Sequence, residues 1–228
     1  MISALLLLFS VAGTDARAEL IPALKPGLEP REIRIYDEKD EERSLAEVAT
    51  SKPAMPILLL PAYTRCRASC PIMVKSLKMA VAAMPSGEAF RVILFSFDSK
   101  DTRSDLARFR QHEQIPNDWQ LVRSTSESEI AGFLDPFGYN TLSANGEFNH
   151  PSEVFVFSPR FKWVDSLISD VYLPESLQLA HAHAFSADEP SLKDQARELS
   201  RRPENWLILG AIGLVLSIGA IATAFIRG

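Results

Sequence analysis

Two cysteines are the residues best suited to chemistry, and they lie four positions apart. Cys66 and Cys70 follow a short apolar segment, and the proline at position 71 is typical of the first turn of a helix. The dipole and the exposed N–H groups of a helix start favour a thiolate over a thiol, so we expect Cys70 to be acidified. If the loop is one helical turn, the cysteines lie about 6 Å apart, which suits chelation of one metal ion or a disulfide.

A metal ion held by two thiolates needs further ligands. Soft thiolates select Cu(I), zinc or iron–sulfur clusters, and three-coordinate Cu(I) would need only one more donor. Among the histidines, His150 stands in a loop directly before an apolar strand and could reach a site on a neighbouring loop, although spacing alone leaves its role open. We expect the others to be solvated residues on helices: His112, His181 and His183. The alternative is a structural disulfide, but a bridge that encloses three residues removes little entropy from the unfolded chain.

The elements that must position these residues follow from an alternating pattern of apolar strands and helices. Residues 56–61 and 90–97 are apolar runs typical of central strands, and a helix starting at Pro71 has one apolar face. We expect further strands at 33–36, 119–122, 153–157 and 162–171, and further helices at 44–48, 102–114, 126–134 and 174–184. This order predicts one α/β domain over 19–185, built around a mixed sheet.

The two ends of the chain are more apolar than the middle. Residues 2–11 form an uncharged run too short to cross a bilayer, and Ala16-Arg17-Ala18 fits a signal-peptidase site, so residues 1–18 are predicted to be a signal peptide. Residues 205–226 are predicted to be a transmembrane helix, because Trp206–Ile226 carries no charge and is long enough to span a bilayer. The polar segment 186–204 would be a tether. These features predict a domain exported to the periplasmic or extracellular side of the cell membrane.

The composition excludes several functions. The 228 residues include 46% hydrophobic and 23% charged residues, typical of a folded chain, and the net charge of −5 gives no basic footprint for nucleic acid. Two cysteines are also too few for a disulfide framework or a four-cysteine zinc site.

Three segments in this order resemble the Sco/SenC family over about residues 30–180. They are Cys66-Arg-Ala-Ser-Cys70-Pro71 (the family's CxxxCP motif), Ser96-Phe-Asp98-Ser-Lys-Asp-Thr102, and Asn149-His150-Pro151 before a strand. The resemblance implies a thioredoxin-like fold and a protein tethered to the membrane; many members of the family have an N-terminal anchor, whereas the membrane helix predicted here is C-terminal. It also implies a copper carrier rather than an enzyme, which holds copper, as Cu(I) or Cu(II), through Cys66, Cys70 and His150. The implied recipient is the binuclear copper site of cytochrome c oxidase or another exported copper protein.

Several alternatives remain open at this point. Asp98 matches an acidic position near the family's site, but could equally be a helix-capping or surface carboxylate. A thiol–disulfide reductase that keeps a partner's copper-ligating cysteines reduced would need Cys66 and Cys70 but not His150. A peroxiredoxin-type peroxidase is weaker, because Pro61 and Thr64 both lie too close to Cys66 for the Pro-x-x-x-Thr-x-x-Cys pattern. An assembly factor with inert cysteines is the last alternative.

Overall fold

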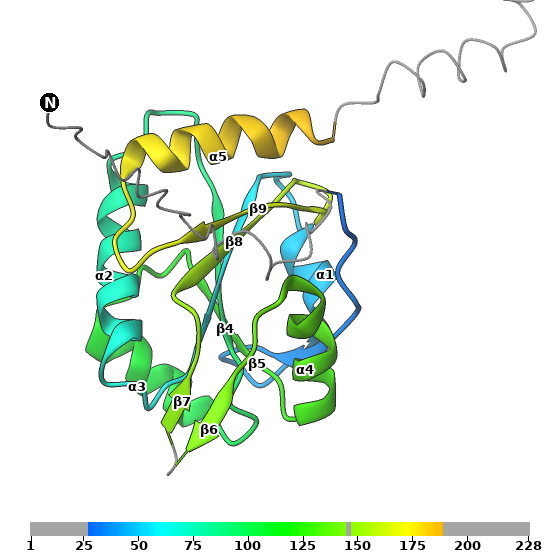
Figure 1. Cartoon of the computed structure of the whole chain (residues 1–228), viewed down its shortest axis with the longest axis vertical. Coiled ribbons are helices and arrows are strands. Elements are labelled where there is room, and N and C mark those ends of the chain that lie inside the picture. Colours follow the sequence, from blue (N-terminus) through cyan, green and yellow to red (C-terminus); the bar gives the residue numbers. More distant parts are fainter. Residues whose placement is uncertain (1–26, 145–146, 189–228) are drawn as a thin grey trace, which may run out of the picture. The chain divides into compact units, whose positions relative to one another are not determined.

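The computed structural model describes residues 27–144 and 147–188 (Figure 1). The strands are β1 (Arg34–Tyr36), β2 (Glu42–Ser44), β3 (Ile57–Ala62), β4 (Arg91–Ser96), β5 (Gln120–Arg123), β6 (Leu142–Ala144), β7 (Glu147–Asn149), β8 (Glu153–Phe157) and β9 (Trp163–Ile168). The helices are α1 (Leu45–Ala49), α2 (Ser69–Ala82), α3 (Arg103–Glu113), α4 (Glu127–Leu134) and α5 (Pro174–Ser186), with a 3-10 turn η1 at Asp135–Phe137.

The main sheet has the strand order β2-β1-β5-β4-β3-β8-β9. Strands β3, β4 and β5 are parallel neighbours, whereas β8 runs antiparallel to β3, with Ile57 opposite Phe157 and Leu59 opposite Phe155. The carboxyl ends of β3 and β4 therefore meet the amino end of β8 at one edge of the sheet. This edge is where ligands tend to bind in α/β folds.

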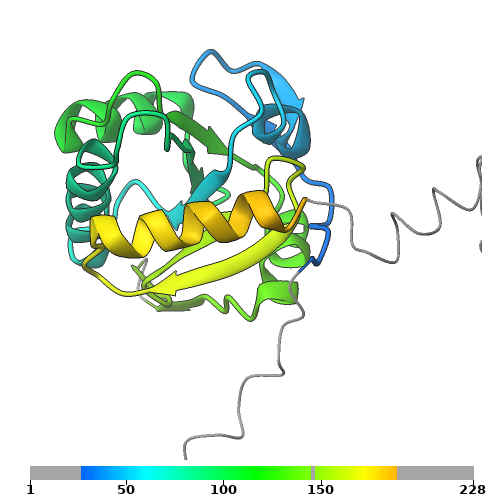
Figure 2. The same cartoon turned by 90° about the horizontal axis from the view of Figure 1, so that it is seen from above.

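Helices cover both faces of the sheet. Helices α2 and α3 lie on one face, and α1 and α4 lie on the other (Figures 1 and 2). All six residues of β3 are buried, as expected for a central strand covered on both sides. The predicted α/β domain with a mixed sheet is confirmed.

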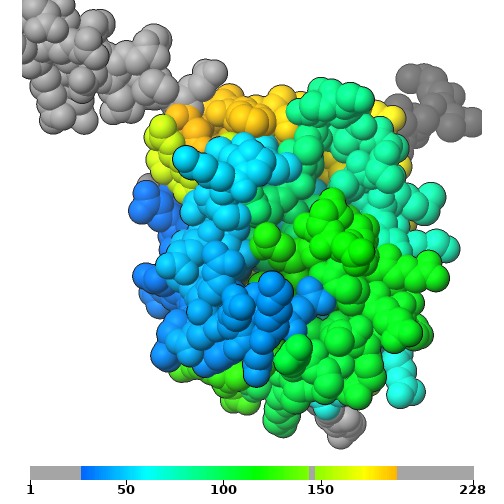
Figure 3. All heavy atoms as spheres, turned by 180° about the vertical axis from the view of Figure 1, so that it is seen from behind, coloured from blue at the N-terminus to red at the C-terminus, as the bar shows by residue number. Residues whose placement is uncertain are grey.

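The N-terminal strands close one side of the domain. Figure 3 shows the N-terminal region, in blue, packed against green residues from the middle of the chain. Two ion pairs connect the turn between β1 and β2 to the rest of the domain. Glu38 binds Arg110 of α3 and Asp40 binds Arg123 of β5, each with an N–O distance of 2.5 Å. A pairing of β1 with β5 at Tyr36 and Arg123 completes the join.

Side-chain caps fix where the helices begin. Ser44, predicted to cap a short helix, forms a capping box with Glu47 at the start of α1. Thr102 forms the same arrangement with Asp105 at the start of α3. Helix α2 begins two residues before the predicted start, with Ala68 at the N-cap, so Cys70 lies inside the first turn.

Two local predictions were wrong. Leu142–Ala144 and Glu147–Asn149 form the paired strands β6 and β7, whereas no strand was predicted directly before His150 because the sequence there lacks an alternating apolar pattern. His181 is buried rather than solvated: it packs against Phe90 and Phe185, with ring centroids 5.1 and 5.0 Å away. Its position, four residues after buried Leu177, places it on the inner face of α5. His112 and His183 are exposed, as expected.

Within residues 27–144 and 147–188, none of the helices has the length and apolar character needed to cross a membrane. The predicted signal peptide at 1–18, the predicted membrane helix at 205–226 and the tether beyond residue 188 lie outside the described residues.

Candidate metal centre

The two cysteines lie where β3 passes into α2. The loop turns through a hydrogen bond from the Cys66 N–H to the Tyr63 carbonyl, 3.2 Å long, and α2 then begins at Ser69. The Cys70 N–H, which belongs to the first turn of α2, donates to Cys66 Sγ at 3.3 Å. Both cysteines are free thiols; Cys66 is 7% exposed and Cys70 is fully buried.

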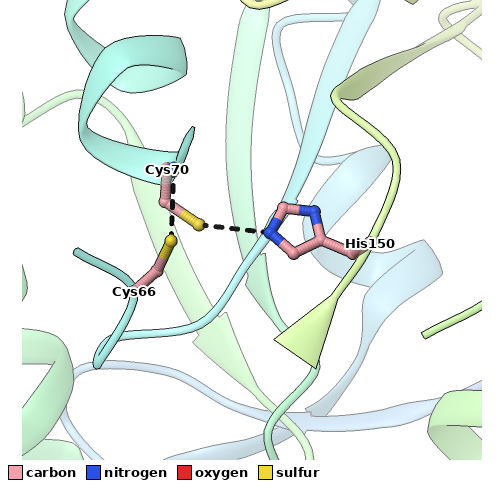
Figure 4. A group of neighbouring side chains, drawn as sticks. All are labelled: Cys66, Cys70 and His150. Carbon is pink, nitrogen blue, oxygen red and sulfur yellow. Dashed lines mark hydrogen bonds between the residues drawn. The ribbon is translucent and has the colours of Figure 1, made fainter. Parts of the chain in front are cut away.

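His150 reaches the cysteines because of the sheet topology. It follows β7 and precedes β8, whose amino end lies beside the carboxyl end of β3. Its Nε2 atom points at the cysteines and lies 3.8 Å from Cys70 Sγ (Figure 4). The two sulfurs and one imidazole nitrogen all lie within 4.8 Å of one another. The structure thus brings together the three residues singled out in the sequence.

The hydrogen bonds of His150 fix its tautomer. Nδ1 lies 2.9 Å from the Pro151 carbonyl, which can only accept, so Nδ1 carries a proton and donates it. The Tyr139 hydroxyl lies 3.0 Å from the same nitrogen. In the neutral ring Nε2 therefore presents its lone pair to Cys70, which is the arrangement of a metal-ligating histidine with a second partner on its other nitrogen.

Ser69 is a fourth polar group in the centre. Its Oγ lies 3.3 Å from His150 Nε2 and 3.8 Å from Cys66 Sγ. The sequence contains this serine between the two cysteines, but nothing in the local pattern shows that its hydroxyl faces the ligand atoms.

The prediction that Cys70 is the acidified thiol was wrong. The hydrogen bond from the Cys70 thiol lowers the pKa of Cys66 to about 3, with His150 and the Cys70 amide contributing further. The same bond to Cys66, together with burial, raises the pKa of Cys70. The Cys70 thiol and, to a smaller extent, the amides of the helix start thus stabilise a thiolate one turn earlier, at Cys66, because its sulfur is the one they face.

The Cys66 sulfur also affects the pKa of His150. Burial opposes its protonation, but hydrogen bonds with the Cys66 sulfur and the Pro151 carbonyl outweigh burial and raise the pKa of His150 above its ordinary value. The metal-free centre therefore favours a negative charge on Cys66; a protonated His150 would place an Nε2–H beside that sulfur, whereas the neutral ring keeps its lone pair on Nε2.

Asp98 lies near the centre without touching the ligand atoms. It is 2% exposed and pairs with the Arg65 guanidinium, which belongs to the cysteine loop, and it also accepts from the Lys100 N–H at 3.0 Å. It is neither a surface carboxylate nor the cap of α3, whose N-cap is Thr102. Its place fits a residue that anchors the loop.

Asp101 is a loop-anchoring residue that the sequence reasoning missed. It is 3% exposed and accepts from the Thr64 N–H at 2.9 Å, the Thr64 hydroxyl at 2.6 Å and the Ser96 hydroxyl at 2.5 Å. The segment from Ser96 to Thr102 is part of the resemblance to the Sco/SenC family, but its sequence does not show that Asp101, as well as Asp98, holds the cysteine loop.

Aromatic rings surround the imidazole and were also missed. The rings of Tyr63, Phe97 and Tyr139 lie with centroids 5.9, 5.4 and 6.1 Å from that of His150. Phe148 packs against Tyr63 and Phe97 at 5.0 and 5.3 Å. The imidazole is therefore half-buried in an apolar wall that limits its rotation and its contact with water.

A family model described as SCO1/SenC matches residues 35–178, more than half of the chain. Among solved structures, a protein of Aquifex aeolicus VF5 to which electron transfer has been ascribed is 30% identical. That comparison has a TM-score of 0.64 and covers 71% of this chain and 95% of the Aquifex chain. No curated protein matches the sequence.

More distant structures have the same fold. Arabidopsis thaliana ScoI with copper bound is 13% identical, with a TM-score of 0.59, and the match covers 70% of this chain and 99% of that one. BsSco, a Sco-family cytochrome c oxidase assembly protein with a disulfide switch, is 19% identical, with a TM-score of 0.58 and coverage of 70% and 96%. The thioredoxin-like fold that the resemblance implied is confirmed.

Proposed function

The chain belongs to the SCO1/SenC family, and from this membership and its Cys66–Cys70–His150 cluster we propose that it binds copper and delivers it to the binuclear copper site of cytochrome c oxidase. The observation that carries the proposal is the convergence of two sulfurs and one imidazole nitrogen within 4.8 Å. The solved Sco protein of Arabidopsis thaliana with copper bound supports it.

The donor set suits Cu(I) as a cargo. Two thiolates and one imidazole are soft ligands that favour Cu(I) and disfavour magnesium or calcium. The acidified Cys66 already carries the charge that a copper ion needs, and His150 Nε2 presents a lone pair toward Cys70. Cys66 is the more exposed cysteine, so a recipient's thiolate would enter the centre from its side.

Delivery to an oxidase subunit would occur outside the cytoplasm. The apolar segment at 2–11, with Ala16-Arg17-Ala18 after it, supports export, and the uncharged segment at 206–226 supports anchoring in the cell membrane. A reporter fused after Phe185 should be active outside the cytoplasm. Activity in the cytoplasm alone would contradict this placement.

Thiol–disulfide reduction of a partner is the second candidate, and the asymmetry of the two cysteines favours it. The Cys66 thiolate would attack a partner disulfide to form a mixed disulfide and release one partner thiolate, and Cys70 would then attack the Cys66 sulfur and displace the second partner thiolate. The products are a Cys66–Cys70 disulfide and two partner thiols, so two electrons leave this chain. The disulfide switch of BsSco supports a redox role for this pair of thiols.

A Cu(I) titration of the full chain separates the candidates. We expect one Cu(I) per chain, no tight binding after Cys66→Ser or Cys70→Ser, and weaker binding after His150→Ala because one of three donors is lost. His183→Ala is the matched control, since this histidine is exposed on α5. It should bind copper as the wild type does.

The outcomes distinguish the two functions. Weaker copper binding by His150→Ala, with unchanged reduction of a test disulfide, would support the copper carrier. Unchanged copper binding in that variant would remove His150 from the ligand set and make the reductase the better proposal.

A further inference from the structure

The Ser69 hydroxyl occupies a position among the ligand atoms. Ser69 is the first residue of α2, directly before Cys70, and is half-buried. Its oxygen lies within hydrogen-bond distance of His150 Nε2, at 3.3 Å, and 3.8 Å from Cys66 Sγ. It contacts one ligand atom from each of the two loops that form the centre.

The serine and a metal ion would use the same lone pair. Because Nδ1 donates to the Pro151 carbonyl, the neutral ring has its lone pair on Nε2, and the Ser69 hydroxyl donates to it. An imidazole nitrogen has one lone pair and cannot accept this hydrogen bond and ligate a metal ion at once. A thiolate sulfur has further lone pairs, so the contact of Ser69 with Cys66 does not exclude a metal.

We propose that Ser69 is an affinity-setting residue that competes with Cu(I) for His150 and makes the cargo easier to release. The inference rests on the proposed copper function and adds a residue to it. A hydrogen bond present only in the metal-free state stabilises that state, and binding of the metal must break it. The net value of such a bond corresponds to between about twofold and tenfold in affinity.

Removal of the Ser69 hydroxyl should lower the Kd for Cu(I), whereas loss of a polar group from a metal site usually weakens binding. The full chain is titrated with Cu(I) under anaerobic reducing conditions in competition with a chromogenic Cu(I) chelator. Ser69→Ala should lower the Kd by about two- to tenfold, and Ser69→Thr, which keeps the hydroxyl, should retain the wild-type Kd. General damage to the site would weaken binding and cannot produce this result.

Ser76 provides a matched control on the same helix. It is also half-buried, but its hydroxyl accepts from the Tyr172 N–H at 2.7 Å and does not face the ligand atoms. Ser76→Ala should leave the Kd for Cu(I) unchanged.

A second background tests the route through His150. Ser69→Ala should have no effect on the Kd when it is combined with His150→Ala, because the bond in question no longer exists. Tightening that persists in this background, or a Ser69→Ala variant that binds no more tightly than the wild type, would overturn the inference while leaving the copper function in place. Failure of the wild type itself to bind Cu(I) would overturn the proposed function, and this inference with it.

Discussion

The two segments that bring the ligand atoms together are held by different forces. The thiol arm, residues 63–70, is fastened to the end of β4 by buried carboxylates. Asp101 accepts three hydrogen bonds, two of them from Thr64, and Asp98 pairs with Arg65. Both aspartates are at most 3% exposed.

The histidine arm, residues 147–151, is held by tyrosine hydroxyls and aromatic rings. The Tyr63 hydroxyl donates to Glu147 at 2.6 Å and accepts from the Phe148 N–H at 3.4 Å. On the other side, Tyr139 lies 3.0 Å from His150 Nδ1. The carboxylate of this arm, Glu147, belongs to an exposed residue rather than a buried one.

The difference indicates which ligand is easier to move. Hydrogen bonds to a buried carboxylate are about twice as strong as neutral ones, and leaving their partners unsatisfied is costly. The thiols are therefore fixed in position, whereas the imidazole is held by weaker contacts and by Ser69. A carrier built this way would bind copper on two rigid thiolates and adjust its affinity through the histidine.

Removal of the Asp101 carboxylate is expected to have the largest effect on stability among the variants that test this comparison. Asp101→Ala leaves the Thr64 N–H, the Thr64 hydroxyl and the Ser96 hydroxyl without their acceptor. We expect the free energy of unfolding to fall by about 3 kcal/mol. Denaturant unfolding of the metal-free protein measures this change.

Asp105→Ala is the control for that variant. Asp105 belongs to the capping box at the start of α3, where its hydrogen bonds are with Thr102 and Arg108 rather than with the thiol arm, and loss of such a cap costs about 1 kcal/mol. If Asp101→Ala lowers the free energy of unfolding by no more than Asp105→Ala does, the Asp101 carboxylate does not hold the thiol arm in place, and the contrast between the two arms is wrong.

The thiol arm was largely predictable because its signals are local. An apolar strand, two cysteines four residues apart and a proline follow one another in the sequence, and the structure has them as β3, the loop and the first turn of α2. The central strands and most helices were predictable for the same reason. The place of His150 before an apolar segment, now β8, indicated only that it could reach the cysteines, and the resemblance to the Sco/SenC family was needed to predict it as a ligand.

The groups that tune the site depend on tertiary contacts and were not predictable. Tyr63 and Tyr139 come from segments 76 residues apart, and no local pattern places both beside His150. The acidified cysteine was misassigned because the sequence predicts a helix start near Cys70 but does not show which sulfur accepts hydrogen bonds from the Cys70 thiol and the amides. Ser69 was overlooked for a related reason: its rotamer, not its position, makes it part of the centre.

Removal of the Tyr63 hydroxyl is a smaller test and addresses the histidine arm. Tyr63→Phe keeps the ring contacts but breaks the bonds to Glu147 and Phe148. We expect a loss of about 1 kcal/mol in the free energy of unfolding. We also expect a several-fold weaker affinity for Cu(I), because the histidine arm is less well positioned. Denaturant unfolding and a competition titration measure the two effects.

Tyr172→Phe is the matched control for Tyr63→Phe. Tyr172 is 5% exposed, and its hydroxyl has no hydrogen-bond partner among the described residues. Its removal should not reduce stability or copper affinity. Equal effects of the two variants would mean that the Tyr63 hydroxyl gives the histidine arm no specific support.

The smallest effect concerns Glu153, a buried carboxyl group just after the histidine arm. It is 7% exposed, and burial raises its pKa, which the hydrogen bond with Ser166 offsets only in part. In the unfolded chain Glu153 loses its proton near the ordinary pKa of glutamate, about 4.3. In the folded protein it holds the proton to higher pH, so stability from this group is lost as pH rises above the unfolded pKa.

Glu153→Gln should therefore raise the free energy of unfolding at pH 7.5. The increase should be smaller than the decrease expected for Tyr63→Phe, and it should become smaller still toward pH 4.5. The reason is that glutamine does not ionise, while a protonated glutamic acid in the same place incurs no charge-burial cost. Denaturant unfolding of both proteins at the two pH values measures the difference, with Glu32→Gln as an exposed control that should show no such trend. A destabilised Glu153→Gln variant at pH 7.5 would mean that the ionised carboxylate is well partnered. The histidine arm would then have a buried anionic anchor beside it, as the thiol arm has, and the contrast between the two arms would disappear.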